Sequence, residues 1–398
     1  MSSMQPAVLA VNAGSSSLKF ALYPLAGDTV APSHLSGMVE GLEPGGTPCL
    51  RLHEEQDDSV HALDGGADGF ACALEAIDAV LRYHAGDYQV CAVAHRIVHG
   101  GERYRQSIVL DDEALGYLGK LVPLAPMHLP HNLACVEVFR RTYPLLPQMA
   151  CFDTAFHATL SEVETMFALP ATLRSAGIRR YGFHGLSYRY VVQRLAADRA
   201  RPGARMLVAH LGSGASACAI VDGRSVATTM GFSALDGLMM GTRCGALDPG
   251  VLVHLVRQGW TLPDLEHMLY HEAGLLGVSG ISADMRTLRA SAEPAAAQAI
   301  DLFTHRFVRE VGGLVACMGG LDLLAFSGGI GEHDAELRQQ SCAALAHLGV
   351  QLDPEANAAA RGDAVLPLHA AASAVEVWVV PTDEAFVAAS DAARLFAH

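Results

Sequence analysis

The sequence predicts an α/β protein built from two duplicated domains whose mixed sheets flank a cleft. At 398 residues the chain exceeds the usual size of a single hydrophobic core. Residues 7–23 have an apolar strand, a bend of small residues and an apolar return strand. Residues 206–226 repeat that order and add a D-G turn and a third strand. Bends rich in Gly and Ser also arise independently, but the shared order favours duplication.

The remaining elements follow in chain order. Residues 24–27 (PLAG) predict a break after the second strand, and residues 69–83 have the apolar spacing of a helix. Residues 89–101 predict a buried strand that opens into a glycine-ended loop. Residues 322–332 predict a strand and a glycine-rich turn, and residues 374–386 predict a strand, a loop and a helix. Ligands of open α/β sheets bind at such carboxyl ends of strands.

The composition indicates a globular protein of a reducing compartment. Hydrophobic residues make up 51% of the chain and charged residues 17%. The net charge of -15, without basic runs, argues against a nucleic-acid binder. The nine cysteines occur singly, which predicts buried free thiols rather than disulfides or a zinc site. We find no signal peptide or membrane-spanning run, and we expect a cytoplasmic protein.

Three glycine-rich segments could direct backbone N–H groups at an anion. They are the bends at residues 12–17 and 212–214 and the turn at residues 327–331. Each alone is typical of a tight turn, whereas the three together favour a bound nucleotide. The first bend is no Walker A loop, because its second glycine is missing and Lys19, one of two lysines, enters another strand.

Several charged residues stand where an ordinary structural role is hard to assign. Arg96 follows a buried strand, where an unpaired guanidinium would be costly, so an anionic ligand or an internal carboxylate must pair it. His184 lies between glycines and Arg243 in a loop rich in Gly and Pro. Asp153 and Glu384 follow apparent strands and could hold Mg²⁺, or could serve as an N-cap and a first-turn acid. This set of groups fits phosphoryl transfer.

Ten blocks, in order, resemble those of the acetate kinases, which share a superfamily with sugar kinases, actin and the heat-shock ATPases. They run from residue 11 to residue 386 and read VNAGSSSLKF, HRIVHGG, LAPMHLP, CFDTAFH, RYGFHGLS, HLGSGAS, GTRCGALDPG, ISADMR, SGGIGE and PTDEAF. The resemblance implies two RNase H-like domains and a homodimer. The first domain would comprise residues 1–153 and 385–398, and the second, residues 154–384, would carry most of the nucleotide site.

The implied activity is reversible, ATP-dependent phosphorylation of acetate to acetyl phosphate, by in-line transfer with Mg²⁺ or Mn²⁺. A propionate or butyrate kinase is the alternative within the family. A non-catalytic nucleotide sensor would lack Arg96, His184, Arg243 or Glu384, and all four are present. A metal-dependent hydrolase is disfavoured, because no cluster of ligands is evident. The partners would be ATP and a small carboxylate, with neither nucleic acid nor membrane.

Roles are implied residue by residue. Arg96, Val98, Met127, Phe183 and Ala234 would bind the acyl acceptor, and Arg96, Asp153, His184 and Arg243 would be catalytic. His128, His184 and Arg243 would support the transition state. Asn12 and Glu384 would serve the metal, with Asp153 beside them, while Ser15 and Ser17 would lie at the phosphate end. The ATP contacts would be Lys19, His210, Gly212, Ser213, Gly214, Asp284, Met285, Arg286, Gly329, Ile330 and Gly331.

The chain departs from the family pattern at three places. Ser213 and Leu129 stand where Asn is usual, and Ser233 and Ala234 replace Thr-Pro. Replacing Pro by Ala should enlarge the methyl pocket slightly. We therefore expect propionate to be accepted appreciably, since one methylene is worth only about 1–3 kcal/mol of discrimination.

Overall fold

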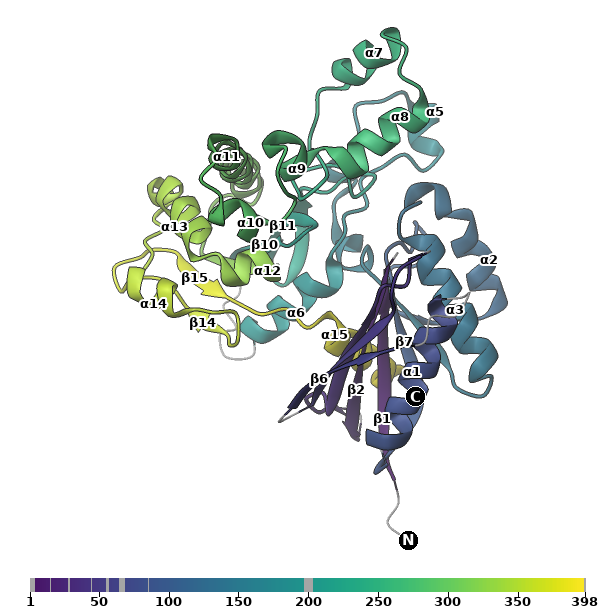
Figure 1. The fold of residues 1–398 in the computed structure, drawn as a ribbon. Coiled ribbons are helices and arrows are strands. Elements are labelled where there is room, and N and C mark those ends of the chain that lie inside the picture. Colours follow the sequence, from purple (N-terminus) through teal and green to yellow (C-terminus); the bar gives the residue numbers. More distant parts are fainter. Residues whose placement is uncertain are drawn as a thin grey trace. The chain divides into compact units, whose positions relative to one another are not determined.

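The computed structural model describes residues 4–14, 16–27, 29–43, 45–54, 57–63, 69–84, 86–196 and 203–396. Ser15, which the resemblance places at the phosphate end, lies outside these residues. The chain divides into two compact units. Unit 1 comprises Met1–Phe156 and Asp383–His398, and unit 2 comprises His157–Thr382. Each unit is built around one sheet (Figure 1).

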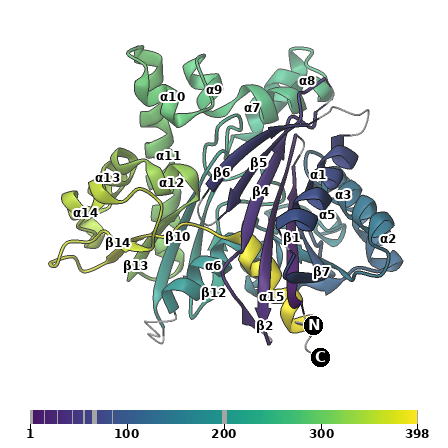
Figure 2. The ribbon, with the colours of Figure 1, turned by 60° about the horizontal axis from the view of Figure 1, so that its bottom comes forward.

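The sheet of unit 1 is mixed and begins with the predicted hairpin. β1 pairs with β2 in antiparallel register, and Asn12 lies opposite Lys19. β7 runs parallel to β1, and β9 runs parallel to β7. The order is β6-β5-β4-β2-β1-β7-β9-β8, with β3 paired to β2; β4, β5 and β6 lie side by side in Figure 2. The strands are β1 (Gln5–Ala13), β2 (Ser17–Ala26), β3 (Thr29–Val30), β4 (Leu35–Glu40), β5 (Cys49–Glu54), β6 (Asp57–Ala62), β7 (Tyr88–Ile97), β8 (Ile108–Val109) and β9 (Gln148–Phe152).

Helices cover both faces of the sheet at β1. Successive side chains of a strand point to opposite faces, and the apolar side chains of β1 need cover on both. Leu9 and Val11 belong to a core shared with α1 and α3, whereas Val8 and Ala10, also buried, point the other way. α15 packs against β1 and β7. The helices of this unit are α1 (Gly69–His84), α2 (Asp112–Lys120), η1 (Val122–Leu124), α3 (Leu129–Thr142) and α15 (Glu384–Phe396), with η2 (Ala155–Thr159) at the boundary.

The sheet of unit 2 repeats this plan, with the order β12-β11-β10-β13-β15-β14. β10 pairs antiparallel with β11 and parallel with β13, which runs parallel to β15. The series β11-β10-β13-β15 therefore has the directions of β2-β1-β7-β9, which confirms the predicted duplication. The strands are β10 (Arg205–Leu211), β11 (Ala215–Val221), β12 (Arg224–Thr228), β13 (Leu323–Ser327), β14 (Leu366–Pro367) and β15 (Glu376–Val379).

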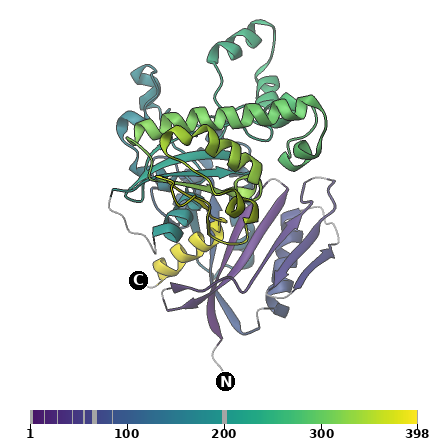
Figure 3. The same ribbon diagram turned by 90° about the vertical axis from the view of Figure 1, so that its left-hand side faces the viewer.

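One long helix dominates the packing of unit 2. α11 (Pro294–Cys317) runs along β10, β11 and β12, and Figure 3 shows it in green across that sheet. Phe303, Phe307 and Val311 lie on its buried stripe at helical spacing. α6 (Gly185–Ala196) packs against β10 and β13. The other helices are α4 (Glu162–Thr165), α5 (Ala171–Ser175), α7 (Pro249–Arg257), α8 (Leu262–His267), η3 (Met268–Glu272), α9 (Gly274–Ser279), α10 (Met285–Ala290), α12 (Gly328–His333), α13 (Ala335–Ala344), η4 (Ala346–Leu348) and α14 (Pro354–Ala359).

The structure differs from the sequence predictions in three details. β2 continues through Pro24 to Ala26, beyond the point where pairing with β4 ends, a position where a strand tolerates proline. The glycine-rich turn after β13 is the short helix α12. All nine cysteines are free, as expected, but Cys317 is exposed and four others are half-buried. Among the described residues, no helix combines the length and apolar character needed to cross a membrane.

Candidate active site

Unit 1 contributes an ion cluster at the carboxyl ends of β7 and β9. Arg96 lies near the end of β7, and Asp153 directly follows β9. Arg96 donates from Nε to Asp153 Oδ1 at 2.9 Å and from Nη2 to Oδ2 at 2.7 Å. Its Nη1 lies 3.1 Å from Oε2 of Glu384, the first residue of α15. Internal carboxylates therefore pair Arg96, which decides between the two alternatives that the sequence left open.

The cluster is shielded from solvent and carries excess negative charge. The side chain of Asp153 is 1% exposed and that of Arg96 is 23% exposed. Burial opposes the Arg96 charge, but attraction to Asp153 and Glu384 outweighs it and raises the Arg96 pKa above its ordinary value. One cation against two carboxylates gives a formal charge of about −1. Glu384, which is 17% exposed, is the more accessible of the two carboxylates.

Neighbouring residues fix the strand ends around this cluster. The Asn132 side chain accepts from the Val98 backbone N–H at 3.0 Å and donates to the Ala13 carbonyl at 2.8 Å. It thereby joins the ends of β1 and β7, a role that no pattern in the sequence indicated. Val98 is buried, while Lys19 is exposed. Of the remaining predicted residues in unit 1, Asn12 is the last but one residue of β1 and is half-buried, as is Met127. His128 is the N-cap residue of α3, and Leu129 is fully buried.

Two histidines near Arg96 are buried and neutral. Burial lowers the pKa of His99 to about 4, and its Nδ1 accepts the Gly101 backbone N–H at 2.9 Å. Burial also lowers the pKa of His95 to about 4, although the hydrogen bond to Gln148 opposes it. We therefore assign these histidines to the structure of unit 1 rather than to its chemistry.

In unit 2 two of the predicted transition-state residues converge on one glycine of the β10–β11 bend. A Cβ atom built on Gly214 would lie 2.8 Å from Arg243 Nη2 and 3.4 Å from His184 Nε2. His184 has a positive φ of 58°, which turns the chain directly before α6. Its Nδ1 is 2.8 Å from Ser216 Oγ, so the opposite nitrogen faces the bend. Only a residue without a side chain leaves room for both groups there.

Arg243 has no carboxylate partner among the described residues. Its Nη1 donates to the carbonyl oxygen of Ala234 at 2.7 Å. Burial lowers the Arg243 pKa, and the partial compensation comes from Tyr270. In contrast to Arg96, this half-buried guanidinium keeps uncompensated positive charge beside a glycine bend, an arrangement suited to an anion.

A hydrogen-bonded chain orients a second histidine beside His184. The two imidazole centroids of His184 and His210 are 4.3 Å apart. His210 Nδ1 lies 2.8 Å from Ser187 Oγ, which accepts from Thr382 Oγ1 at 3.0 Å. His210 Nε2 is thus left on the side of the bend, 3.8 Å from a Cβ built on Gly212. Sequence reasoning missed Ser187 and Thr382, since a single hydroxyl carries no pattern.

The residues predicted to contact ATP occupy three further positions of unit 2. Asp284 is the N-cap of α10 and accepts the Arg286 backbone N–H at 2.8 Å. The Arg286 side chain is exposed and ion-paired to Asp284, while Met285 is buried. Gly329, Ile330 and Gly331 lie in α12, and Ser213 is exposed at the β10–β11 bend.

Two buried side chains that the sequence did not single out fix α12. Glu332 Oε1 accepts the backbone N–H groups of Gly328 at 2.7 Å and Thr382 at 3.1 Å, and burial raises the Glu332 pKa. Arg338, fully buried, donates to the carbonyls of Gly331 and Glu332 at the end of the helix. A cation at a helix C-terminus complements the helix dipole.

Comparison with known proteins identifies the family. The sequence model of the Acetokinase family matches residues 7–390. The chain belongs to the acetokinase family. An acetate kinase of Rhodopseudomonas palustris is 46% identical over 402 residues, covering 98% of this chain and 99% of the relative. The crystal structure of Porphyromonas gingivalis acetate kinase is similar, with a TM-score of 0.86 and 34% identity over 97% of this chain and 98% of that one.

A propionate kinase is structurally just as similar to this acetokinase. The crystal structure from Francisella tularensis has a TM-score of 0.88 and 33% identity over 97% of this chain and 98% of that one. The fold alone therefore does not select the acid. Within the described residues, no group of three or more His, Cys, Asp or Glu side chains could hold a metal ion.

Proposed function

We infer that this acetokinase transfers the γ-phosphoryl group of ATP to acetate and forms acetyl phosphate and ADP. A carboxylate oxygen of acetate bonds to the γ-phosphorus, and the bond from that phosphorus to the β–γ bridging oxygen breaks, leaving its electron pair on ADP. The reverse reaction restores ATP. The single observation that carries the proposal is the convergence of Arg243 and His184 on Gly214 in a chain of this family.

Arg243 and His184 act on the transferring phosphoryl group. In-line transfer needs donors around the equatorial oxygens more than covalent chemistry. The Arg243 guanidinium, which has no carboxylate partner in the described part of the chain, provides these donors together with His184 Nε2, which Ser216 orients. The family resemblance also assigns His128 a supporting role in the transition state. Because these donors are already in place, the transition state requires little reorganisation.

Mg²⁺ would be bound together with the nucleotide, as part of the MgATP substrate. It prefers one or two carboxylates together with phosphate oxygens, so the Arg96 cluster fits this requirement without a full protein cage. Glu384 and Asn12 would hold the metal, whereas Asp153 remains paired with Arg96 through two hydrogen bonds. A guanidinium has five N–H donors, so Arg96 keeps donors for the acetate carboxylate.

The glycine bend and α12 hold the nucleotide. Gly212, Ser213 and Gly214 direct backbone groups at its phosphates, and the family resemblance adds Lys19 and His210 to the ATP contacts. Asp284, Met285, Arg286, Gly329, Ile330 and Gly331 form the adenosine side of the site. We also propose that residues 154–384 carry most of the nucleotide site, that the chain forms a homodimer, and that it works in the cytoplasm.

On the family resemblance, we assign Val98, Met127, Phe183 and Ala234 to the acyl pocket. Ala234 leaves more room than proline, which favours a propionate kinase as the second candidate, and the similarity to the Francisella propionate kinase agrees with it. The test is trapping of acyl phosphate by hydroxylamine, with ATP, Mg²⁺ and formate, acetate, propionate or butyrate. We expect a maximum at acetate and an appreciable propionate signal. A maximum at propionate would favour the second candidate, and no hydroxamate from any acid would refute both.

A further inference from the structure

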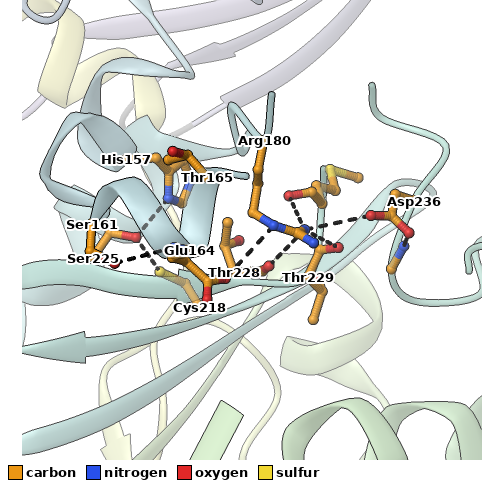
Figure 4. Close-up of polar contacts among 12 residues, drawn as sticks. His157, Ser161, Glu164, Thr165, Arg180, Cys218, Ser225, Thr228, Thr229 and Asp236 are labelled. Atoms are coloured by element: carbon orange, nitrogen blue, oxygen red, sulfur yellow. Dashed lines mark hydrogen bonds and ion pairs between the residues drawn. The ribbon is translucent and has the colours of Figure 1, made fainter. Parts of the chain in front are cut away.

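Arg180 contacts the loop that carries Ala234 at the point where the loop begins. We define the acyl loop as residues 231–236, which lie shortly after β12. Arg180 Nη1 donates to the carbonyl oxygens of Thr228 at 3.1 Å, Thr229 at 3.3 Å and Met230 at 3.0 Å. Figure 4 shows Arg180 beside Thr228 and Thr229, with these contacts as dashed lines. A single side chain thus fixes three consecutive carbonyls that lead into the loop.

The same guanidinium also reaches the end of the acyl loop. Arg180 Nη1 lies 3.5 Å from Oδ2 of Asp236, and the other carboxylate oxygen accepts the Gly237 N–H at 2.8 Å. Arg180 Nε lies 3.7 Å from Oε1 of Glu164, and the ring of Phe167 lies 5.7 Å from its Cζ atom. With 20% of its side chain exposed, Arg180 is bound between both ends of the loop.

The backbone beside Arg180 extends these contacts toward the catalytic groups. The Tyr181 N–H donates to the Gly231 carbonyl at 3.0 Å, and the chain then continues to Phe183 and His184. His157 adds a second link, because its Nε2 lies 2.9 Å from the Phe183 carbonyl oxygen. Its Nδ1 lies 2.8 Å from Oγ of Ser225 in β12 (Figure 4). The segment that bears His184 and the segment that bears Ala234 are therefore joined side by side.

The acyl loop is held from its middle by Arg243, whose Nη1 donates to the Ala234 carbonyl. Arg180 at the ends and Arg243 at the middle consequently share one short loop. We propose that Arg180 is a positioning residue that fixes the acyl loop, and so sets acyl-chain selectivity and the orientation of Arg243, without touching substrate. This inference rests on the proposed function, which places Ala234 in the acyl pocket.

The test compares Arg180→Met with the wild-type chain. Methionine keeps an apolar stem but removes every donor, so the loop loses its anchors while its packing is largely retained. We expect the KM for acetate to rise about tenfold and kcat to fall, with the KM for ATP within about twofold. The ratio of kcat/KM for propionate to that for acetate should rise at least about threefold, because a loosened loop admits longer acids.

Arg205→Met is the matched control. Arg205 also pairs with an aspartate and a backbone carbonyl, namely Asp322 and Gly319, but it does so at the start of β10. This variant removes the same kinds of hydrogen bond and ion pair from unit 2. It should leave the ratio of kcat/KM for propionate to that for acetate (the acid ratio) unchanged. Asp236→Asn and Arg180→Lys are milder changes to the anchor itself. Both should shift the acid ratio in the same direction as Arg180→Met, but less.

Each outcome of these measurements either supports or refutes the positioning role of Arg180. If Arg180→Met lowers the Tm but leaves the acid ratio and the acetate KM at the values of Arg205→Met, Arg180 is merely structural and the inference is wrong. If Arg180→Met does not fold, an unchanged acid ratio in both Arg180→Lys and Asp236→Asn overturns it. A wild-type chain that yields no hydroxamate from any acid refutes the proposed function and this inference together. An active wild type with unshifted variants refutes this inference alone.

Discussion

Gly214→Ala isolates the geometry at the convergence of Arg243 and His184. The new methyl group would lie 2.8 Å from Arg243 Nη2, whereas a comfortable separation is about 3.5 Å, so the guanidinium must retreat by roughly 0.7 Å. Displacements near 1 Å cost about a hundredfold in rate. We therefore expect kcat to fall between about tenfold and a hundredfold, or ~1.4–2.7 kcal/mol of transition-state stabilisation.

The fold should tolerate this change. The atom that must move is the end of a flexible side chain, and Gly214 does not have a positive φ. Alanine in compatible backbone even restricts the unfolded chain, which typically stabilises a protein by about 0.4–1 kcal/mol. The Tm of Gly214→Ala should consequently stay within about 2 °C of the wild type.

The assay is steady-state hydroxamate formation with acetate, giving kcat and both KM values, next to a thermal unfolding curve. Gly212→Ala is the comparison in the same bend, because its methyl group would meet the Gly214 carbonyl at 3.3 Å and His210 Nε2 at 3.8 Å but would not crowd Arg243. It should lose less kcat than Gly214→Ala. Equal losses in the two variants, or a kcat for Gly214→Ala within about threefold of wild type, would refute the reasoning.

Three other predictions follow from the buried groups and the pocket. Arg96→Ala should raise the acetate KM, lower kcat and cost about 3–5 kcal/mol of unfolding free energy by leaving Asp153 buried without a cation; adding Asp153→Asn should restore part of that stability but not activity. Urea unfolding should show stability falling between pH 6.5 and pH 4, because His95 and His99, with folded pKa values of about 4, are protonated more readily in the unfolded chain. Each histidine changes the free energy of unfolding by at most about 1.4 kcal/mol per pH unit. His99→Asn should make the fall of stability with pH less steep, and an unchanged slope would contradict the assignment of His99 as buried and neutral. Ala234→Pro should lower the propionate-to-acetate ratio of kcat/KM about tenfold, and an unaltered ratio would remove Ala234 from the pocket.

The strand–bend–strand repeats made much of the fold predictable from the sequence. Apolar runs with small-residue bends specify hairpins by local chemistry, and both hairpins form where expected. Pro24 indicated a break after the second strand, but β2 continues through it. Its effect depends on where the neighbouring strand β4 stops, which is a tertiary property. The glycines after β13 looked like a turn, yet the buried side chains of Glu332 and Arg338 stabilise a short helix there.

The candidate site was predictable only as a set of residue types at strand ends. The sequence singled out Arg96 as a cation that needs a partner, but the partner had to come from distant segments, and only the folded chain selects Asp153 and Glu384. Supporting residues were missed for the same reason. Ser187 orients His210 from within a helix, and Arg180 acts through backbone carbonyls, which carry no sequence signature.

The most direct test of the central claim is ³¹P NMR of ATP, Mg²⁺ and acetate mixed with the wild-type chain or with Arg243→Leu. The account predicts that the wild type forms acetyl phosphate and ADP in equal amounts. It predicts that Arg243→Leu does so at least about a hundredfold more slowly, with a nearly unchanged KM for ATP, because the guanidinium acts mainly on the transition state. ADP without acetyl phosphate from the wild type, or full activity in the variant, would contradict the account.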